Sequence, residues 1–168
     1  MTFLFAILAL LAGLVVQATL GRWFPEAQRF VDVLTWPVAW YAVARSQRSA
    51  MFVGCAAGLI EDAWLHAGVF GLLGFSKTLA GWALGGLGAR FDLNHAWGRM
   101  FVGAALFLMD RLVEAGLLLL LNLSIVAPDP LDLALGAGIN GLLVAVVFSI
   151  VQKVRGQEAV RRPVRRRG

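Results

Sequence analysis

Six apolar runs occupy almost the whole of this 168-residue chain and limit what it can fold into. They cover roughly residues 3–20, 30–44, 50–65, 71–89, 99–122 and 131–153. A helix that crosses a bilayer needs about 20 mostly apolar residues, within a range of about 17–25. Hydrophobic residues make up 60% of the chain and charged residues only 15%, unlike an average soluble domain. We therefore expect an all-α, polytopic integral membrane protein with six transmembrane helices, two of them short.

The connections between these runs are too short to form a second folded unit. We expect one six-helix transmembrane domain over residues 1–154, followed by a basic cytoplasmic tail over residues 155–168 that is disordered and attracted to anionic lipid. The first run is also compatible with a secretory signal, because Val16, Gln17 and Ala18 resemble a cleavage site. No Lys or Arg precedes that run, so we interpret it as a retained first helix.

The distribution of basic residues predicts how the chain is oriented. Six spans place both termini on one side, and short cytoplasmic loops are enriched in Lys and Arg. With cytoplasmic termini, the outer loops carry only Arg22 and Arg29. The inner segments then carry Arg45, Arg48, Arg90, Arg99, Lys153, Arg155, Arg161, Arg162, Arg165, Arg166 and Arg167. We expect a multi-pass protein of the cytoplasmic (inner) membrane with both termini in the cytoplasm.

Several classes of function lack the residues they need. His66 and His95 each stand alone in a connecting loop, without a second His or Cys at ligand spacing, so we expect no metal site. No serine–histidine, cysteine–histidine or phosphate-loop pattern is present, so we expect no catalytic residues, no enzyme activity and no cofactor. The net charge of +5 comes largely from the tail, and we do not infer nucleic-acid binding from it.

Glycines are concentrated in the third and fourth runs at helical spacing. Gly54, Gly58 and Asp62 follow one another at four-residue steps, which places them along one side of a helix. A second row of small residues, at steps of three and four, consists of Gly71, Gly74, Thr78, Gly81, Gly85 and Gly88. Small residues let membrane helices approach closely. The rows predict either close packing within the bundle or a surface that receives a helix of another protein.

Charged residues also lie inside the apolar runs, where they are energetically unfavourable unless they are paired. They are Glu61, Asp62, Lys77, Asp110, Arg111 and Glu114. We expect a buried polar cluster in which the two cations meet some of the four carboxylates, with Asn140 as a further polar contact. Because the charges do not balance, a carboxyl group is protonated, lies at a wet edge or meets a partner's cation. Such a cluster either fixes helix register and docks a partner, or relays protons or binds a small polar ligand.

The central stretch resembles a known family. Gly54, Gly58 and Asp62, then Gly68 and Gly71, then the run FSKTLAGW over residues 75–82 are similar to the central signature of the bacterial rod shape-determining membrane protein MreD. The size, the six runs, the short loops and the basic end agree with that family along almost the whole chain. Glu61, beside Asp62, is not part of the pattern and leaves open which carboxylate does the family's job.

The resemblance implies a non-enzymatic membrane scaffold of the elongation machinery (elongasome) that builds side-wall peptidoglycan and determines cell shape. Family members bind the bitopic protein MreC and work with RodA, a class B penicillin-binding protein and the filament protein MreB. The implied fold is similar to the substrate-binding subunits of energy-coupling-factor transporters. The alternative is therefore a small-molecule-binding membrane subunit of a transporter, with the six charged residues lining its pocket. For the scaffold, we expect the glycine rows and the groove around Asp62 and Lys77 to form helix contacts, within the bundle or to MreC.

Overall fold

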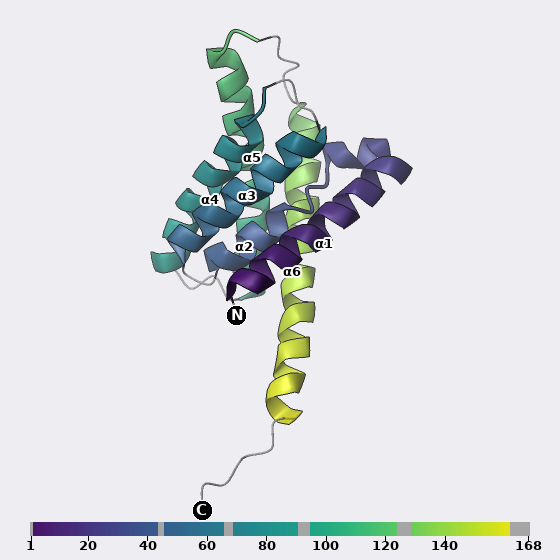
Figure 1. The fold of residues 1–168 in the computed structure, drawn as a ribbon, viewed down its shortest axis with the longest axis vertical. Coiled ribbons are helices and arrows are strands. Elements are labelled where there is room, and N and C mark those ends of the chain that lie inside the picture. Colours follow the sequence, from purple (N-terminus) through teal and green to yellow (C-terminus); the bar gives the residue numbers. More distant parts are fainter. Residues whose placement is uncertain (1, 44–45, 66–68, 91–94, 124–128, 162–168) are drawn as a thin grey trace, which may run out of the picture.

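The protein is built from helices that differ widely in length and burial. The computed structural model describes residues 2–43, 46–65, 69–90, 95–123 and 129–161. Within these residues the chain is all-α, as predicted, with six α-helices and one short 3-10 helix (Figure 1). In chain order they are α1 (Thr2–Trp23), η1 (Pro25–Arg29), α2 (Thr35–Val43), α3 (Gln47–Leu65), α4 (Leu72–Arg90), α5 (Ala96–Leu120) and α6 (Pro130–Arg161).

Two helices of the described chain are long and apolar enough to cross a membrane. They are α1, over Leu4–Trp23, and α6, over Pro130–Lys153. A buried core helix or a signal sequence can satisfy the same criterion of length and composition. Two of the six expected transmembrane helices therefore meet this criterion of length and composition. The helices α3, α4 and α5 contain the charged residues noted above, and α2 is too short.

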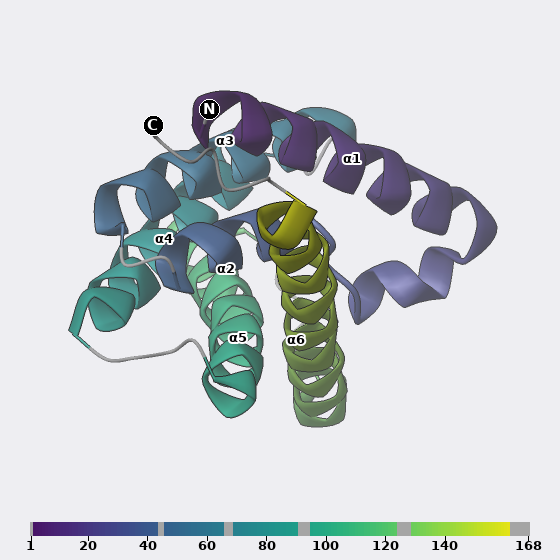
Figure 2. The same ribbon diagram turned by 90° about the horizontal axis from the view of Figure 1, so that it is seen from below.

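The nine-residue helix α2 lies at the centre of the molecule. It packs against α1, α3, α4, α5 and α6, and the view in Figure 2 shows it surrounded by them. The sequence predicts a continuous run over residues 30–44, but the helix begins only at Thr35. Pro37 explains this start, because proline fits the first turn of a helix but not its interior. The five residues before α2 form a non-helical, buried connection from η1.

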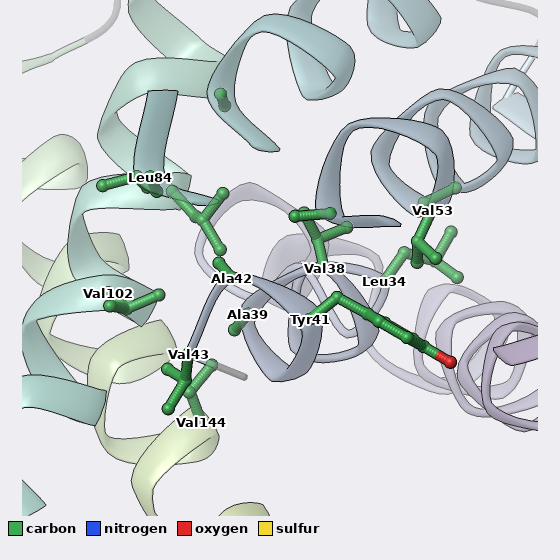
Figure 3. Packing of buried hydrophobic residues seen from close by; sticks show 14 of the residues in the cluster. Leu34, Val38, Ala39, Tyr41, Ala42, Val43, Val53, Leu84, Val102 and Val144 are labelled. Carbon is green, nitrogen blue, oxygen red and sulfur yellow. The ribbon is translucent and has the colours of Figure 1, made fainter. Parts of the chain in front are cut away.

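The hydrophobic core is centred on α2. Its buried side chains include Val38, Ala39, Ala42 and Val43, which contact residues of the surrounding helices (Figure 3). Val102 of α5 and Val144 of α6 are fully buried in the same cluster. By contrast, α1 lies at the edge of the bundle and packs against η1, α2 and α3. The core therefore joins α2 to α6, while α1 covers one side.

The last helix extends beyond the predicted domain boundary. α6 continues past residue 154 to Arg161, so the first half of the expected disordered tail is helical. Residues 157–161 (QEAVR) are mostly good helix formers, and the next helix-breaking residue is Pro163. Residues 162–168 lie outside the described part of the chain. Figure 1 shows α1 beginning and α6 ending toward the same end of the molecule.

Candidate functional site

Lys77 stands at the centre of a buried cluster of charges that we call the charged centre. Its ammonium nitrogen lies 2.7 Å from Asp110 Oδ2 and 3.1 Å from Glu61 Oε2, and it also pairs with Asp32 Oδ2. The four side chains come from α4, α5, α3 and the connection before α2. Each of these residues is no more than 5% exposed. The charged centre thus joins four segments at one point inside the bundle.

Hydrogen bonds hold the two aspartates in place. Ser76 Oγ donates to Asp110 Oδ1 at 2.5 Å and to the Asp110 backbone oxygen at 2.8 Å. Asp32 Oδ1 accepts the Leu34 backbone N–H at 3.0 Å. Each aspartate therefore uses one oxygen for Lys77 and the other for a neutral donor. A buried carboxylate is stabilised when both of its oxygens accept hydrogen bonds in this way.

Asp32 was not among the residues predicted for the cluster. It lies inside the second apolar run, as Glu61 lies inside the third. A charged residue inside an apolar run indicates a buried ion pair, so Asp32 could have been identified in the same way. The structure brings it to Lys77 because residues 30–34 are not helical and cross the interior of the bundle. Of the six predicted members, Glu61, Lys77 and Asp110 belong to the charged centre.

Two buried amides support the non-helical connection. Asn140 of α6 accepts the Asp32 N–H at 3.0 Å and donates to the Phe30 carbonyl at 2.7 Å. Gln17 of α1 accepts the Val33 N–H at 2.9 Å and donates to the Val31 carbonyl at 3.3 Å. These bonds replace those that a helix would have made. Buried backbone N–H and C=O groups outside a helix need such partners.

Asp62 has a different role from its neighbour Glu61. Its carboxylate accepts the backbone N–H groups of Gly71 at 3.0 Å, Leu73 at 3.2 Å and Gly74 at 2.9 Å. These are donors at the start of α4 that have no partner within the helix. A negative charge is also favourable at that position. Asp62 therefore caps α4 from the end of α3 and does not join the charged centre.

Arg111 and Glu114 form a separate pair on α5. Arg111 Nη1 lies 3.1 Å from Glu114 Oε2, as their spacing predicts, and its guanidinium lies 5.5 Å from the centre of the Phe107 ring. Their side chains are 27% and 23% exposed, so the pair lies toward the edge of the bundle. Arg111 also lines an open pocket of about 390 Å³ with Pro25, Gln28, Arg29, Phe107, Asp132 and Leu133.

The first glycine row lies in the contact between α3 and α4. A Cβ added to Gly54 would collide with the Lys77 carbonyl, and one added to Gly58 would collide with the Leu73 carbonyl. Gly74 fits in the same way against Leu59, whose Cδ2 lies 2.9 Å from the position of such a Cβ. The absence of side chains here lets the two helix backbones touch. This contact brings Glu61 and Lys77 within reach of each other.

The second row continues the same contact toward the other end of α4. A Cβ on Gly81 would lie 2.5 Å from the Ala50 carbonyl oxygen, and one on Gly85 would lie 2.8 Å from Gln47 Cα. Gly88 instead fits against the Ala42 carbonyl of α2. Gly71 precedes the helix at a φ of +95°, where glycine is favoured, and Thr78 donates to the Gly74 carbonyl. These positions favour packing within the bundle over an exposed docking surface.

The charged centre leaves little space for a ligand. Beside Lys77 and Asp110 there is a cavity of only about 10 Å³, which is also lined by Thr35, Val38, Ala80 and Leu106. That is roughly the volume of one water molecule. Within the described residues, no group of three or more His, Cys, Asp or Glu side chains is arranged to hold a metal ion. Gly68 and His66 lie outside those residues.

No protein-family model, curated protein or solved structure matches the chain.

Proposed function

We propose that this chain is a non-enzymatic membrane scaffold of the bacterial machinery for rod shape and peptidoglycan elongation, a member of the MreD family that binds MreC. The resemblance of residues 54–82 to that family supports this proposal. The structural observation that carries it is the closed charged centre, whose buried ion pairs join four segments and leave about 10 Å³ beside them. Pockets for small molecules are typically about 300–1,000 Å³. These charges suit the fixing of helix positions better than the binding of a substrate.

The proposed setting is the cytoplasmic membrane, crossed six times with both termini in the cytoplasm. Large apolar side chains on the outside of α1 and α6 support it, among them Leu8, Val15, Leu142 and Ile150. α2 is about 14 Å long, whereas the hydrocarbon core is about 30 Å thick. The second span would therefore be discontinuous, with α2 completed by residues 30–34. The hydrogen bonds from Gln17 and Asn140 to that connection suit a segment enclosed at membrane depth.

Copurification tests the scaffold proposal. The tagged full-length chain, extracted from its native membrane in mild detergent, is expected to retain MreC, with RodA, a class B penicillin-binding protein and MreB in a larger assembly. A multi-pass membrane protein of unrelated function, expressed at the same level and extracted in the same way, is the control. Loss of rod shape on depletion of the chain is the matching cellular result. If MreC is absent from the purified material and depleted cells keep their shape, the proposal fails.

One observation favours the alternative, a small-molecule-binding subunit of a transporter. The open pocket of about 390 Å³ is large enough for a small polar ligand, and Arg29, Arg111 and Asp132 line it. Of the six charged residues expected to line a ligand pocket, Arg111 is the one that lines this open pocket. The same purification distinguishes the two functions, because a transporter subunit is expected to copurify with a pair of ATPases and not with MreC.

A further inference from the structure

The three carboxylates around Lys77 differ in how their oxygens are satisfied. Both oxygens of Asp32 accept hydrogen bonds, from Leu34 N–H and from Lys77. Both oxygens of Asp110 do so as well, from Ser76 and from Lys77. A carboxylate whose two oxygens both accept hydrogen bonds, one of them from an ammonium group, is stabilised in its ionised form. Asp32 and Asp110 are therefore the ionised members of the charged centre.

Glu61 is the exception. It is 4% exposed, and its Oε2 has no hydrogen-bond partner among the described residues. This oxygen lies 3.1 Å from Lys77 Nζ, an ion-pair distance, but the contact does not have the geometry of a hydrogen bond, whereas Lys77 does donate to both aspartates. A buried, ionised oxygen without a hydrogen bond is strongly unfavourable. A protonated, neutral Glu61 does not carry this cost.

The charges that face Glu61 also favour its neutral, protonated form. From α4 it faces Lys77, from the connection before α2 it faces Asp32, and from α5 it faces Asp110. Arg111 of α5 adds a favourable field at longer range, but its strongest interaction is with Glu114. Asp62, next to Glu61 on α3, is engaged by the N-terminus of α4. An ionised Glu61 would be a third negative charge around a single ammonium group.

We propose that Glu61 is a neutral carboxylic acid at neutral pH, which makes the charged centre a proton-binding site. This inference concerns the chemistry of the cluster and does not depend on the scaffold function. Binding of the proton keeps Glu61 of α3 stable beside Lys77 of α4, and its loss adds an unbalanced buried charge that weakens the contact between these two helices. An exposed glutamate is ionised at neutral pH, so the folded protein holds one more proton than the unfolded chain there. Stability should then fall as the pH rises through the range in which Glu61 releases its proton.

Infrared spectroscopy of the full-length protein in lipid nanodiscs tests this directly. A protonated carboxylic acid has a carbonyl stretch that is separate from the bands of carboxylates and shifts in D₂O. We expect this band in the wild-type protein at neutral pH, its loss in Glu61→Gln, and its retention in the matched control Glu114→Gln. A wild-type protein without the band, or a Glu61→Gln variant that keeps it, overturns the proposal.

Thermal unfolding gives a second, independent readout. Glutamine has the shape of the neutral acid, so Glu61→Gln is expected to fold and to melt within a few degrees of the wild type at neutral pH. It should also lose the fall in stability that the wild type shows as the pH rises toward and through the range in which Glu61 releases its proton. Asp110→Asn, which removes an ionised partner of Lys77, is expected to lower the melting temperature clearly more. A Glu61→Gln variant that fails to fold, or is destabilised as much as Asp110→Asn, contradicts the assignment.

Discussion

At the residue scale, two adjacent acids with the same charge have separate roles. Successive helical residues point about 100° apart, so Glu61 and Asp62 reach different parts of α4. Glu61 points to Lys77 inside the bundle, whereas Asp62 points to the start of α4. One acid therefore belongs to an ion-pair network, and the other satisfies backbone donors. Their contacts assign the two acids separate structural roles.

The cap formed by Asp62 leads to a prediction. Asp62→Ala removes the acceptor for three backbone N–H groups, so unfolding free energy should fall by about 1–3 kcal/mol. Asp62→Asn keeps one acceptor oxygen and should lie between the wild type and the alanine variant. Denaturant titration in detergent, followed by tryptophan fluorescence, measures the difference. Asp132→Ala, which changes an acid in the first turn of α6, is the control and should have a smaller effect. Equal losses at the two positions would argue against the cap.

At the element scale, the α3–α4 pair determines whether the charged centre can form. Backbone contact at Gly54, Gly58 and Gly81 brings the two helices close enough for Glu61 to reach Lys77. A larger residue in this contact has no free space to occupy, because the atoms it would meet belong to the facing backbone. The charged centre therefore depends on the glycines in this contact, because they allow the close helix packing that brings Glu61 to Lys77.

Replacing a glycine in the helix contact should be far more damaging than replacing one outside it. Gly81→Leu places a side chain against the Ala50 carbonyl, and the expected loss of stability is about 1–3 kcal/mol or more. Gly138→Leu is the matched control, since a Cβ there meets nothing within 4 Å. Melting temperature in detergent and size-exclusion behaviour provide the comparison. Two variants of similar stability would show that α3 and α4 do not touch at Gly81.

At the scale of the whole molecule, many large apolar side chains lie on the outside of the bundle, while Asp32, Glu61, Lys77 and Asp110 are buried inside it. This inverts the usual arrangement of a soluble protein and suits a lipid environment. The discontinuous second segment fits the same view, since its polar backbone is enclosed by α1 and α6. In the proposed orientation, η1 lies outside the cell and the start of α3 lies in the cytoplasm.

Cysteine labelling tests that orientation. In a Cys55→Ala background, Glu26→Cys places a thiol in η1 at an exposed position, and Arg48→Cys places one at the exposed start of α3. With outer-membrane access provided, a membrane-impermeant maleimide should label Glu26→Cys in intact cells and Arg48→Cys only after lysis. The Cys55→Ala protein alone is the control for background labelling. The opposite pattern would reverse the topology, and labelling of both positions in intact cells would contradict a span between them.

Sequence reasoning was most successful where the signal is local. Apolar runs longer than a few turns become helices because each turn satisfies its own backbone, and α1, α3, α4, α5 and α6 correspond to predicted runs. The pairing of Arg111 with Glu114 follows from their spacing on one helix. The buried charge at Lys77, with Glu61 and Asp110 as partners, follows from the high cost of isolated charge in an apolar segment.

The sequence by itself thus determined the helices, the rows of small residues and the need for a buried cluster. Only the tertiary structure decided that Asp32 enters the charged centre and Asp62 does not, and that the second run is broken before Thr35. Helical periodicity gives the side of a helix on which a residue lies, but not which element packs against that side. That choice depends on contacts between residues far apart in the chain, such as Asp32 with Lys77 and Asn140. No local pattern contains that information.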